Sequence, residues 1–501
     1  MQFLTLLFTL PAVNALLGLL WPGHRRWLGP LQTIGSAVLF AVTVGLAHHI
    51  VTVGPISLWQ GSIYVDALSG IILLIIGGVG TLAALYGAGY MIADLDANAP
   101  TTAPAASVES NRPPRRLRFY YLLFNLFVLT MLAMAISGNM GMFWMAIEGS
   151  TMFSAFLVGY YTKKAPLEAA WKYVILCTVG IAFALIGIVL TYYAVLKAQG
   201  NLAQGLNWLY LYKLAPKLDP HLIKVAFVFI LVGFGTKAGL APIHNWLPDA
   251  HSESPTPISA MLSCVLLNCA LLGIIRYVLL TQLVIDPAFA QHLLLFFGLL
   301  SLGLAVPFIL VQQNIKRLLA YSSIAQAGYA LIGLVTLTQD GSGATMFYLL
   351  MYIFTNIAAF GVIVLVSNVT HSDDLKDLSG LSRRSPFLAL VMLLAVLSLS
   401  GIPPTAGFFG KFFVFKAAVD AGMWWLALIG ILNAFVGLYY YLTIVKYMYL
   451  YRSEEDDVAI PVSRAARVGL VLSALFIVYL GVSAGPAFEL TRQAAAAFFS
   501  G

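Results

Sequence analysis

Residues 229–257 read FILVGFGTKAGLAPIHNWLPDAHSESPTP, and this stretch decides how the whole chain is interpreted. An apolar run of the kind that enters a bilayer carries a charged residue, Lys237, and is then interrupted by Gly239 and Pro242. A charge at the bilayer centre costs at least about 2.5–3.5 kcal/mol on insertion scales, so such residues are rare and mark functional sites. Interrupted helices at that depth are typical of transport sites, because protein or water must satisfy the freed backbone groups. The stretch therefore predicts a broken transmembrane helix with a titratable lysine beside its break.

A second stretch has the same design. Residues 397–418 read LSLSGIPPTAGFFGKFFVFKAA, where Pro403 and Pro404 interrupt apolar sequence ahead of another lysine, Lys411. Proline has no backbone N–H and breaks a helix, so a second broken transmembrane helix is expected. The alternative at each site is structural. Lys237 would then be a fixed cation, and Lys411 would extend to the outer surface of the membrane.

The acidic residue that falls well inside a predicted span is Glu148, in GMFWMAIEGSTMFSAFLVG (residues 141–159). Desolvation favours the neutral carboxyl group and a nearby cation favours the carboxylate, so a glutamate that faces a lysine can gain and lose a proton. A static buried ion pair that fixes helix packing is the alternative. One acid and two lysines in apolar surroundings indicate a proton path through Glu148, Lys237 and Lys411.

The composition places the rest of the chain in a membrane as well. Of 501 residues, 60% are hydrophobic and 9% are charged, whereas soluble domains carry about 25% charged residues. Apolar runs predict an all-α polytopic membrane protein, a single transmembrane domain over residues 1–501 with about fourteen transmembrane helices. These runs lie near residues 2–21, 31–53, 66–92, 119–136, 141–162, 170–196, 221–243, 257–280, 290–311, 315–337, 343–368, 385–415, 421–446 and 465–485.

The two broken helices occupy equivalent places in two sets of five predicted helices. The first set covers residues 119–280 and the second covers residues 290–446, and the fourth helix of each set is the broken one. Because each set has an odd number of spans, the two would be inverted relative to each other in the membrane. The order therefore predicts two inverted five-helix repeats, a pattern found in transporters.

The positive-inside rule orients the predicted bundle. Most of the 27 lysines and arginines fall in alternate loops or beside them, including Arg25, Arg26, Arg116, Arg383 and Arg384. We therefore expect a multi-pass protein of a bacterial inner membrane with both termini outside. The net charge of +7 belongs to these loops and is not a nucleic-acid signal.

Polar residues between the two lysines are candidates for a proton relay. Serine, tyrosine, glutamine and asparagine side chains could hold water there, and histidines expected near the cytoplasmic surface could pass protons at neutral pH. Each could equally make only a packing hydrogen bond or cap a loop. Lys172 could join the path or form a helix-end ion pair with Glu168. The relay candidates are Lys172, His244, His251, Asn268, Ser322, Ser323, Gln326 and Tyr329, with Tyr321, Tyr348, Tyr352 and Asn356 as further polar groups.

The chain shows no sequence signal for a cofactor or a metal. Cys177, Cys264 and Cys269 all fall inside apolar runs, without metal-ligand spacing or a disulfide pattern, so we interpret them as packing residues. The sequence has no P-loop, GxGxxG, CxxC cluster or haem motif. We therefore expect that ATP, NADH, haem and iron–sulfur clusters are not bound by this chain.

Three long motifs resemble a known family: GTKAGLAPIHNWLPDAHSESPTPISAML (235–262), IKRLLAYSSIAQAGYALIG (315–333) and SGIPPTAGFFGKFFVF (400–415). They are similar to the antiporter-like membrane subunits of respiratory complex I, of group 4 hydrogenases and formate hydrogenlyase, and of Mrp-type cation/proton antiporters. The resemblance covers about the third to the thirteenth predicted helix. It implies that Glu148 and Lys237 form a coupled pair and that Lys411 is the exit-side group.

One residue departs from the family pattern. Many members carry a lysine or histidine in the middle of the eighth helix, where MLSCVLLNCALLGIIR (261–276) offers Asn268. Water or Gln326 would then have to bridge the centre.

The resemblance implies a proton-translocating membrane subunit of a redox-driven complex, with the driving chemistry in partner subunits. One alternative is a proton- or sodium-coupled module of an antiporter or of an inorganic-carbon uptake complex. Another is a structural anchor with a disused path, against which the intact Glu148, Lys237 and Lys411 argue.

Overall fold

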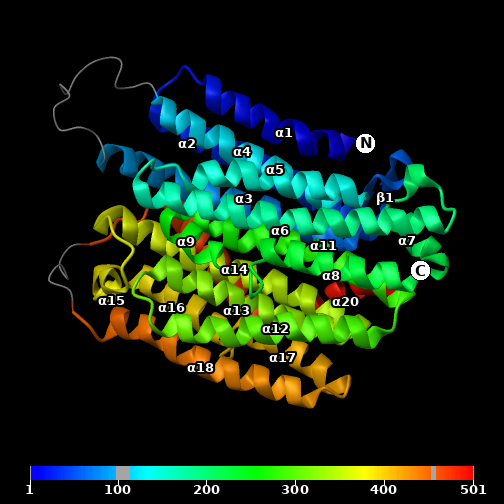
Figure 1. Ribbon diagram of the computed structural model, residues 1–501. Helices are drawn as coiled ribbons and strands as arrows, with labels where there is room; N and C mark the ends of the chain where they lie inside the picture. Colours follow the sequence, from blue (N-terminus) through cyan, green and yellow to red (C-terminus); the bar gives the residue numbers. More distant parts are fainter. Residues whose placement is uncertain (1, 98–112, 453–458, 500–501) are drawn as a thin grey trace.

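A computed structural model describes residues 2–97, 113–452 and 459–499 of the chain. It confirms an all-α polytopic protein, in which long helices run side by side along one direction (Figure 1). Within those residues, the sheet structure is a single antiparallel pair, β1 (Ile56–Leu58) and β2 (Ile63–Val65), in the connection between the second and third helices.

The helices follow one another in two parts of the chain. The first part of the chain forms α1 (Gln2–Leu20), α2 (Arg25–Val53), α3 (Ala67–Ala97), α4 (Arg115–Ile136), α5 (Met140–Val158), α6 (Lys164–Lys197), α7 (Trp208–Leu214), α8 (Pro220–Lys237), α9 (Trp246–Glu253), α10 (Thr256–Met261) and α11 (Leu267–Val284). The second part forms α12 (Pro287–Leu310), α13 (Ile315–Val335), α14 (Gln339–Thr370), α15 (Leu381–Arg384), α16 (Pro386–Ser400), α17 (Ala406–Asp420), α18 (Trp424–Tyr449), α19 (Arg464–Val482) and α20 (Ala484–Phe499).

The number of spans agrees with the expectation from the sequence. In the described residues, 13 helices are long and apolar enough to cross a membrane, with α10 and α11 joined into one span. The half-helices α16 and α17 together supply a further, broken span. The inverted-repeat relation between residues 119–280 and residues 290–446 stays a prediction.

Both predicted helix breaks are present, and glycine and proline cause them. Helix α8 ends at Lys237, and the chain then passes Gly239, with a left-handed φ of 71°, before α9 begins. Helix α16 ends at Ser400, where Gly401 has a φ of 88° and Pro403 follows. A left-handed φ favours glycine, and proline cannot donate to the helix ladder, so neither helix continues.

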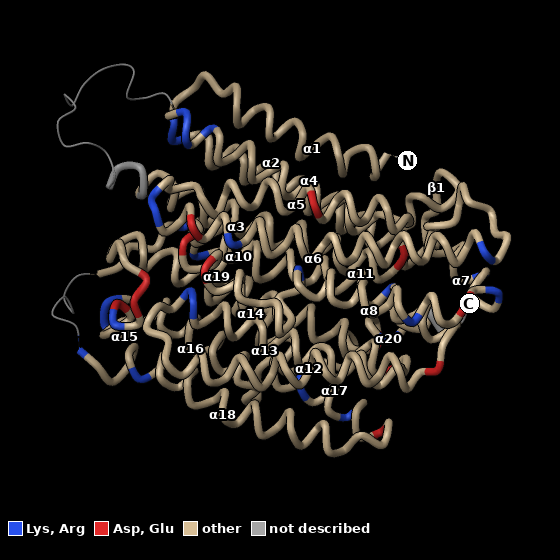
Figure 2. Tube along the Cα trace, in the orientation of Figure 1, with Lys and Arg blue, Asp and Glu red and all other residues tan. Residues whose placement is uncertain are grey.

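Charged residues gather at the two ends of the bundle, and few lie along its middle (Figure 2). Both chain termini lie at one end (Figure 1), as an even number of crossings requires. The other end, which we call the basic end, carries the starts of α2 and α4, with Arg25 and Arg116, and the short helix α15, with Arg383. Charged ends and an apolar middle are the distribution expected of a protein that spans a lipid bilayer.

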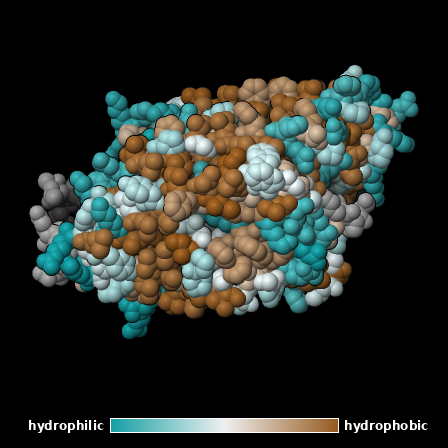
Figure 3. Space-filling view, turned by 90° about the horizontal axis from the view of Figure 1, so that it is seen from below, coloured by the Kyte–Doolittle hydropathy of each residue, from teal (hydrophilic) through white to brown (hydrophobic). Residues whose placement is uncertain are grey.

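The core is largely apolar, as in a soluble protein, but it also holds many polar side chains, and large apolar side chains cover much of the outside. The most apolar windows of Thr256–Val284 and Ile315–Val335 are wholly buried, whereas those of α1, α2 and α18 are mostly exposed. Figure 3 shows hydrophobic surface across the middle of one face, with hydrophilic surface mainly toward its ends. The central helices α11, α13 and α14 are therefore shielded from lipid, and they can hold polar groups.

Candidate functional site

Lys237 lies at the first helix break, at the last residue of α8, with its side chain fully buried. Its Nζ donates to Thr151 Oγ1 of α5 at 2.8 Å and to the Tyr173 hydroxyl of α6 at 2.5 Å. The Tyr173 hydroxyl is also 2.6 Å from Ser154 Oγ. The ammonium group further lies 4.6 Å from the centre of the Tyr173 ring. Hydroxyl groups and an aromatic face therefore replace the water that a lysine would otherwise bind.

Glu148 lies one helical turn from this site but does not form an ion pair with the lysine. Thr178 of α6 donates to Glu148 Oε1 at 3.1 Å, and Glu148 Oε2 is buried without a hydrogen-bond partner in the described residues. Thr151, which binds Lys237, is three residues after Glu148 on α5, so the two share one helix face. Glu148 and the partner of Lys237 therefore lie on neighbouring turns of α5. No direct bond joins Glu148 to Lys237 in the described residues.

Lys411 lies after the second helix break, in α17, with its side chain buried. Its Nζ donates to the backbone carbonyls of Leu399 and Ser400, both at 2.8 Å. These are the last two residues of α16, and a helix C-terminus carries a partial negative charge. The ammonium group also lies 4.7 Å from the centre of the Tyr329 ring. The alternative in which the Lys411 side chain extends to the membrane surface is wrong, because the side chain points into the break.

Gln326 of α13 connects Lys411 to the middle of the bundle. It accepts a hydrogen bond from the Tyr348 hydroxyl, and its amide donates to the Tyr441 hydroxyl at 3.2 Å. The same amide donates to the Leu399 carbonyl at 3.4 Å, the carbonyl that also accepts from Lys411. Gln326 and Lys411 thus donate to the same backbone carbonyl.

A second group of hydrogen bonds lies beside Gln326. Ser323 Oγ is 2.7 Å from Ser263 Oγ of the π turn between α10 and α11, and it accepts from the Tyr352 hydroxyl at 2.7 Å. Asn356 donates to the Tyr352 hydroxyl at 3.0 Å. Ser322, by contrast, binds the Tyr441 hydroxyl. The central helices therefore carry two neighbouring groups of hydrogen-bonded polar side chains, and each member satisfies a packing role. Their part in a proton relay stays a prediction.

Asn268 occupies the position in α11 where many family members were expected to carry a titratable group. It donates to the Cys264 carbonyl at 2.7 Å and is buried. Together with Ser323, Gln326 and Tyr348 it lines a cavity with about 10 Å³ of room for the centre of a water molecule. That is roughly the space one water needs. The structure thus brings Asn268 and Gln326 together, with space for one water beside them.

Of the remaining relay candidates, Lys172, His244 and His251 lie toward the basic end, and Tyr329 lies beside Lys411. Lys172 has a side chain that is 49% exposed and forms ion pairs with Glu168 at 2.9 Å and with Asp249 at 3.2 Å, so the predicted helix-end ion pair is confirmed. His244 and His251, expected near the surface, are both buried. Tyr329 donates to Asn433 at 2.8 Å, beneath Lys411.

The sequence interpretation missed several polar partners. Tyr173 and Thr151 hold Lys237, yet nothing in their local sequence distinguishes them. Arg276 and Asp66 form a buried bidentate pair at 2.9 and 3.1 Å. Lys316 is buried against Asp373 at 2.8 Å.

The described residues hold no group of three or more histidine, cysteine or acidic side chains that could bind a metal. Cys177, Cys264 and Cys269 are buried and unpaired, in agreement with a packing role. The site offers lysine and carboxyl groups, which can gain and lose protons, and hydroxyl and amide groups, which can form hydrogen bonds to them or to water.

Comparison with known proteins shows which family has this arrangement. The family model described as "NADH:quinone oxidoreductase/Mrp antiporter, TM" matches residues 137–437, more than half of the chain. The chain belongs to this family. A second model, "NADH-Ubiquinone oxidoreductase (complex I), chain 5 N-terminus", matches residues 59–98. The family match covers Glu148, both lysines, Asn268 and Gln326.

Relatives in this family are subunits of larger complexes. The chain is 35% identical to NADH-quinone oxidoreductase subunit N of Moorella thermoacetica, over 76% of this chain and 78% of that protein. It is also 35% identical to the hydrogenase-4 component F homolog of Methylacidiphilum infernorum, over 71% and 72% of the two chains. The resemblance inferred from the motifs is confirmed, including both the complex I type and the hydrogenase type.

Solved structures share the fold over nearly the whole chain. A chain of respiratory complex I from Thermus thermophilus has a TM-score of 0.76 and 26% identity, covering 98% of this chain and 99% of that one. A chain of the membrane-bound sulfane sulfur reductase, an archaeal respiratory membrane complex, has a TM-score of 0.84 at 24% identity, covering 99% and 98%. These matches support a multi-pass membrane subunit that assembles with other membrane subunits.

Proposed function

We propose that this chain is a proton-translocating subunit of a redox-driven membrane complex of the complex I or group 4 hydrogenase type. The observation that carries the proposal is a pair of buried lysines at two helix breaks, with a cluster of hydrogen-bonded polar side chains between them. Buried ionisable groups in membrane spans are costly and mark ion pathways. The driving chemistry then belongs to partner subunits in the same complex.

The proposed path begins at Glu148 and Lys237. Protonation shifts as Glu148, which accepts from Thr178, and Lys237, which donates to Thr151, move together and apart. A change of charge at Lys237 then acts through the central cluster, where Gln326 and one water bridge the position of Asn268. Proton release takes place at Lys411. The two predicted repeats, residues 119–280 and 290–446, would each supply one broken helix to this path.

The basic end is proposed to face the cytoplasm of a bacterial cell, with both termini outside. Exposed apolar side chains cover α18 and the outer face of α5 and α6, among them Phe435, Met145 and Trp171. Lipid or neighbouring membrane subunits would cover these faces.

A second candidate follows from the family, because its description includes Mrp antiporters. In that case the same groups would couple protons to sodium, in an antiporter or an inorganic-carbon uptake complex. Proton uptake by vesicles that contain the purified complex separates the two candidate functions when sodium in the buffer is replaced with potassium. Proton movement that needs sodium favours the antiporter.

The test of the main proposal begins with the complex as the cell assembles it. The tagged chain is copurified, its partners are identified by mass spectrometry, and the complex is reconstituted into vesicles. We expect redox partners in the preparation and proton uptake when their substrate is added. Lys411→Ala should lower that uptake by about 100-fold, the scale of a lost proton-transfer group, without loss of partners. A preparation without redox partners, or full uptake by Lys411→Ala, would overturn the proposal.

A further inference from the structure

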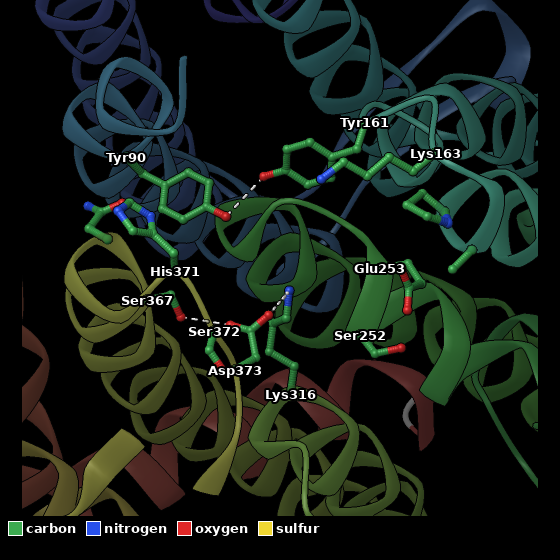
Figure 4. A pocket seen from close by; sticks show the side chains of 13 residues that line it. Tyr90, Tyr161, Lys163, Ser252, Glu253, Lys316, Ser367, His371, Ser372 and Asp373 are labelled. Atoms are coloured by element: carbon green, nitrogen blue, oxygen red, sulfur yellow. Dashed lines mark hydrogen bonds and ion pairs between the residues drawn. The ribbon is translucent and has the colours of Figure 1, made fainter. Parts of the chain in front are cut away.

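A polar cavity opens at the basic end of the bundle and is not part of the path described so far. It encloses about 680 Å³, within the range of ligand pockets, about 300–1,000 Å³. Its lining comes from the end of α3, the start of α6 with the loop before it, the end of α9, the start of α13 and the end of α14 with the connection that follows. Figure 4 shows Tyr161 and Lys163 on one side and Lys316 and Asp373 on the opposite side.

The Lys316 side of the cavity is an ion pair whose two charges cancel. The Lys316 side chain is 4% exposed, and its Nζ lies 2.8 Å from Asp373 Oδ2. The same ammonium group donates to the Ser254 carbonyl at 3.1 Å, and the other carboxylate oxygen of Asp373 accepts from Ser367 at 2.7 Å. Because these two residues satisfy each other, a ligand would have to be bound by other groups.

Two opposite charges that line the cavity are left without a partner. Lys163 precedes α6 and Glu253 ends α9, and neither forms a hydrogen bond or an ion pair within the described residues. Glu253 is half-buried, so its carboxylate is only partly hydrated. His371 lines the cavity as well, on the side away from Glu253 (Figure 4). A positive and a negative group that face one cavity without joining each other suit a ligand that carries both charges.

The Lys163 side of the cavity carries groups that suit a phosphate. Tyr161, two residues before Lys163, has its hydroxyl 3.0 Å from the Tyr90 hydroxyl, and both tyrosines line the cavity. Thr162, between Tyr161 and Lys163, accepts from Arg116 at 3.0 Å, which brings a second positive charge to this rim. Ammonium and guanidinium groups form short, strong hydrogen bonds to phosphate oxygens.

The cavity borders a surface that faces lipid. Ala165 and Pro166 line it at the start of α6, and exposed apolar side chains begin at the next residue of that helix. The side chains of Leu167 and Trp171 are 43% and 66% exposed. Tryptophan is enriched at the level of the lipid headgroups. A phospholipid whose acyl chains lie along α6 can therefore place its headgroup in the cavity.

We propose that this cavity binds the headgroup of a phospholipid that carries both a phosphate and a primary ammonium group, as phosphatidylethanolamine does. The phosphate lies against Lys163 and the hydroxyls of Tyr90 and Tyr161, and the ammonium group lies against Glu253. The bound headgroup joins the start of α6 to the end of α9. This site is separate from the proposed proton path, and its test needs no transport.

Carbodiimide coupling tests the contact between the ammonium group and Glu253. The complex is placed in nanodiscs of phosphatidylcholine, which has no primary amine, with phosphatidylethanolamine as a minor component. The carbodiimide joins a carboxylate to an amine that touches it, forming an amide while it takes up one water and becomes a urea. Mass spectrometry should find the lipid amide on Glu253 at least about tenfold more often than on Glu168, an exposed carboxylate at the same end. Equal yields at the two residues would overturn the proposal.

Two neighbouring lysines supply a matched pair of variants. Lys163→Met removes the proposed phosphate partner and should lower the yield of the Glu253 amide by about tenfold or more, since a hydrogen bond between charged groups is lost. Lys164→Met removes the next lysine, which does not line the cavity, and should leave the yield unchanged. Both side chains are exposed, so neither substitution should disturb folding. A full yield from Lys163→Met would overturn the proposal.

Two further measurements identify the ligand. Soluble glycerophosphoethanolamine has the same headgroup without acyl chains, and in nanodiscs of phosphatidylcholine alone it should couple to Glu253 at least about tenfold less than the lipid, which the membrane concentrates at the site. Equal coupling would show a soluble ligand and overturn the lipid assignment. Phosphatidylglycerol has the phosphate but no ammonium group, so an equal amount of it should lower the yield from phosphatidylethanolamine by no more than about twofold. A tenfold loss would show a site for anionic lipid and overturn the role of Glu253.

Discussion

Lys237 and Lys411 lie beside the same kind of helix break, yet their surroundings differ. Lys237 donates to two hydroxyl groups from neighbouring helices, Thr151 and Tyr173. Lys411 donates to two backbone carbonyls of the half-helix that precedes it. A hydroxyl group both donates and accepts, whereas a carbonyl only accepts. The first site can therefore pass a proton along its own hydrogen bonds, and the second can only hold one until water removes it.

This difference means that the two halves of the proposed path differ in how well their hydrogen bonds can carry a proton. At Lys237, hydrogen bonds run on from the Tyr173 hydroxyl to Ser154, so the side chains themselves form a chain. At Lys411, the link to Gln326 passes through the shared Leu399 carbonyl, which carries no proton. Coupling between the halves is therefore expected to be electrostatic, with charge at one lysine changing the energy of a proton at the other.

The largest effect is expected from Lys237→Ala. Removal of the titratable group that binds Thr151 and Tyr173 should abolish proton uptake, a loss of at least about 100-fold. Assembly of the complex should persist, because α8 still packs against α6 and α11 through its apolar side chains. Proton uptake by reconstituted vesicles checks the expected loss of transport, and copurification of the partner subunits checks that the complex still assembles. Loss of the subunit from the complex would instead indicate a structural lysine.

A matched pair of tyrosine variants sharpens the comparison. Tyr173→Phe removes a hydroxyl that binds the Lys237 ammonium, and a hydrogen bond to a charged group contributes about 1.5–3 kcal/mol, so uptake should fall by about tenfold or more. Tyr329→Phe keeps the aromatic face near Lys411 and loses only a hydrogen bond to Asn433. Its uptake should change little. Equal losses in the two variants would show that the lysine sites work alike.

At Gln326, we expect the rate of proton uptake to depend on space for water as much as on the amide side chain. Gln326→Leu fills the site with an apolar group and should slow uptake severalfold, about the effect of one lost hydrogen bond. Gln326→Ala enlarges a polar cavity that already has room for about one water, so added water should restore much of the rate. The ratio of the two rates in vesicles is the measurement. A slower alanine variant would mean that the glutamine itself is required.

The smallest effect is expected from Lys172→Ala. Its side chain is half-exposed and its partners, Glu168 and Asp249, are at the surface of the basic end. Exposed ion pairs contribute about 0–1 kcal/mol, so neither uptake nor thermal stability should change by more than about twofold or a degree or two. A strong loss of uptake would place Lys172 on the path.

The helix breaks and their lysines could be predicted because their causes are local. Glycine, proline and a charge within apolar sequence each act on the residues beside them, so Lys237 and Lys411 were identifiable from a single chain. The partners could not be predicted in the same way. The carbonyls that hold Lys411 belong to the backbone and have no sequence signature, and Asp66 binds Arg276 from 210 residues away.

Lys316 shows the same limit of sequence-based prediction, because its local sequence gives no sign that it is buried. It stands next to Arg317 in a stretch that has the pattern of an ordinary basic helix end. Burial against Asp373 depends on how the connection after α14 folds over the start of α13, which local pattern does not determine. Likewise, the absence of a bond between Glu148 and Lys237 follows from the rotation of α5, a tertiary property.

Proton uptake by the reconstituted complex with Lys411→Arg tests the central claim, that the second lysine itself gains and loses a proton. Arginine preserves the positive charge and can reach the same two carbonyls, but it stays protonated at neutral pH. We predict that Lys411→Arg assembles normally and fails to restore uptake, close to Lys411→Ala. Uptake at the rate of the unsubstituted complex would show that a fixed charge is enough, and it would contradict the account.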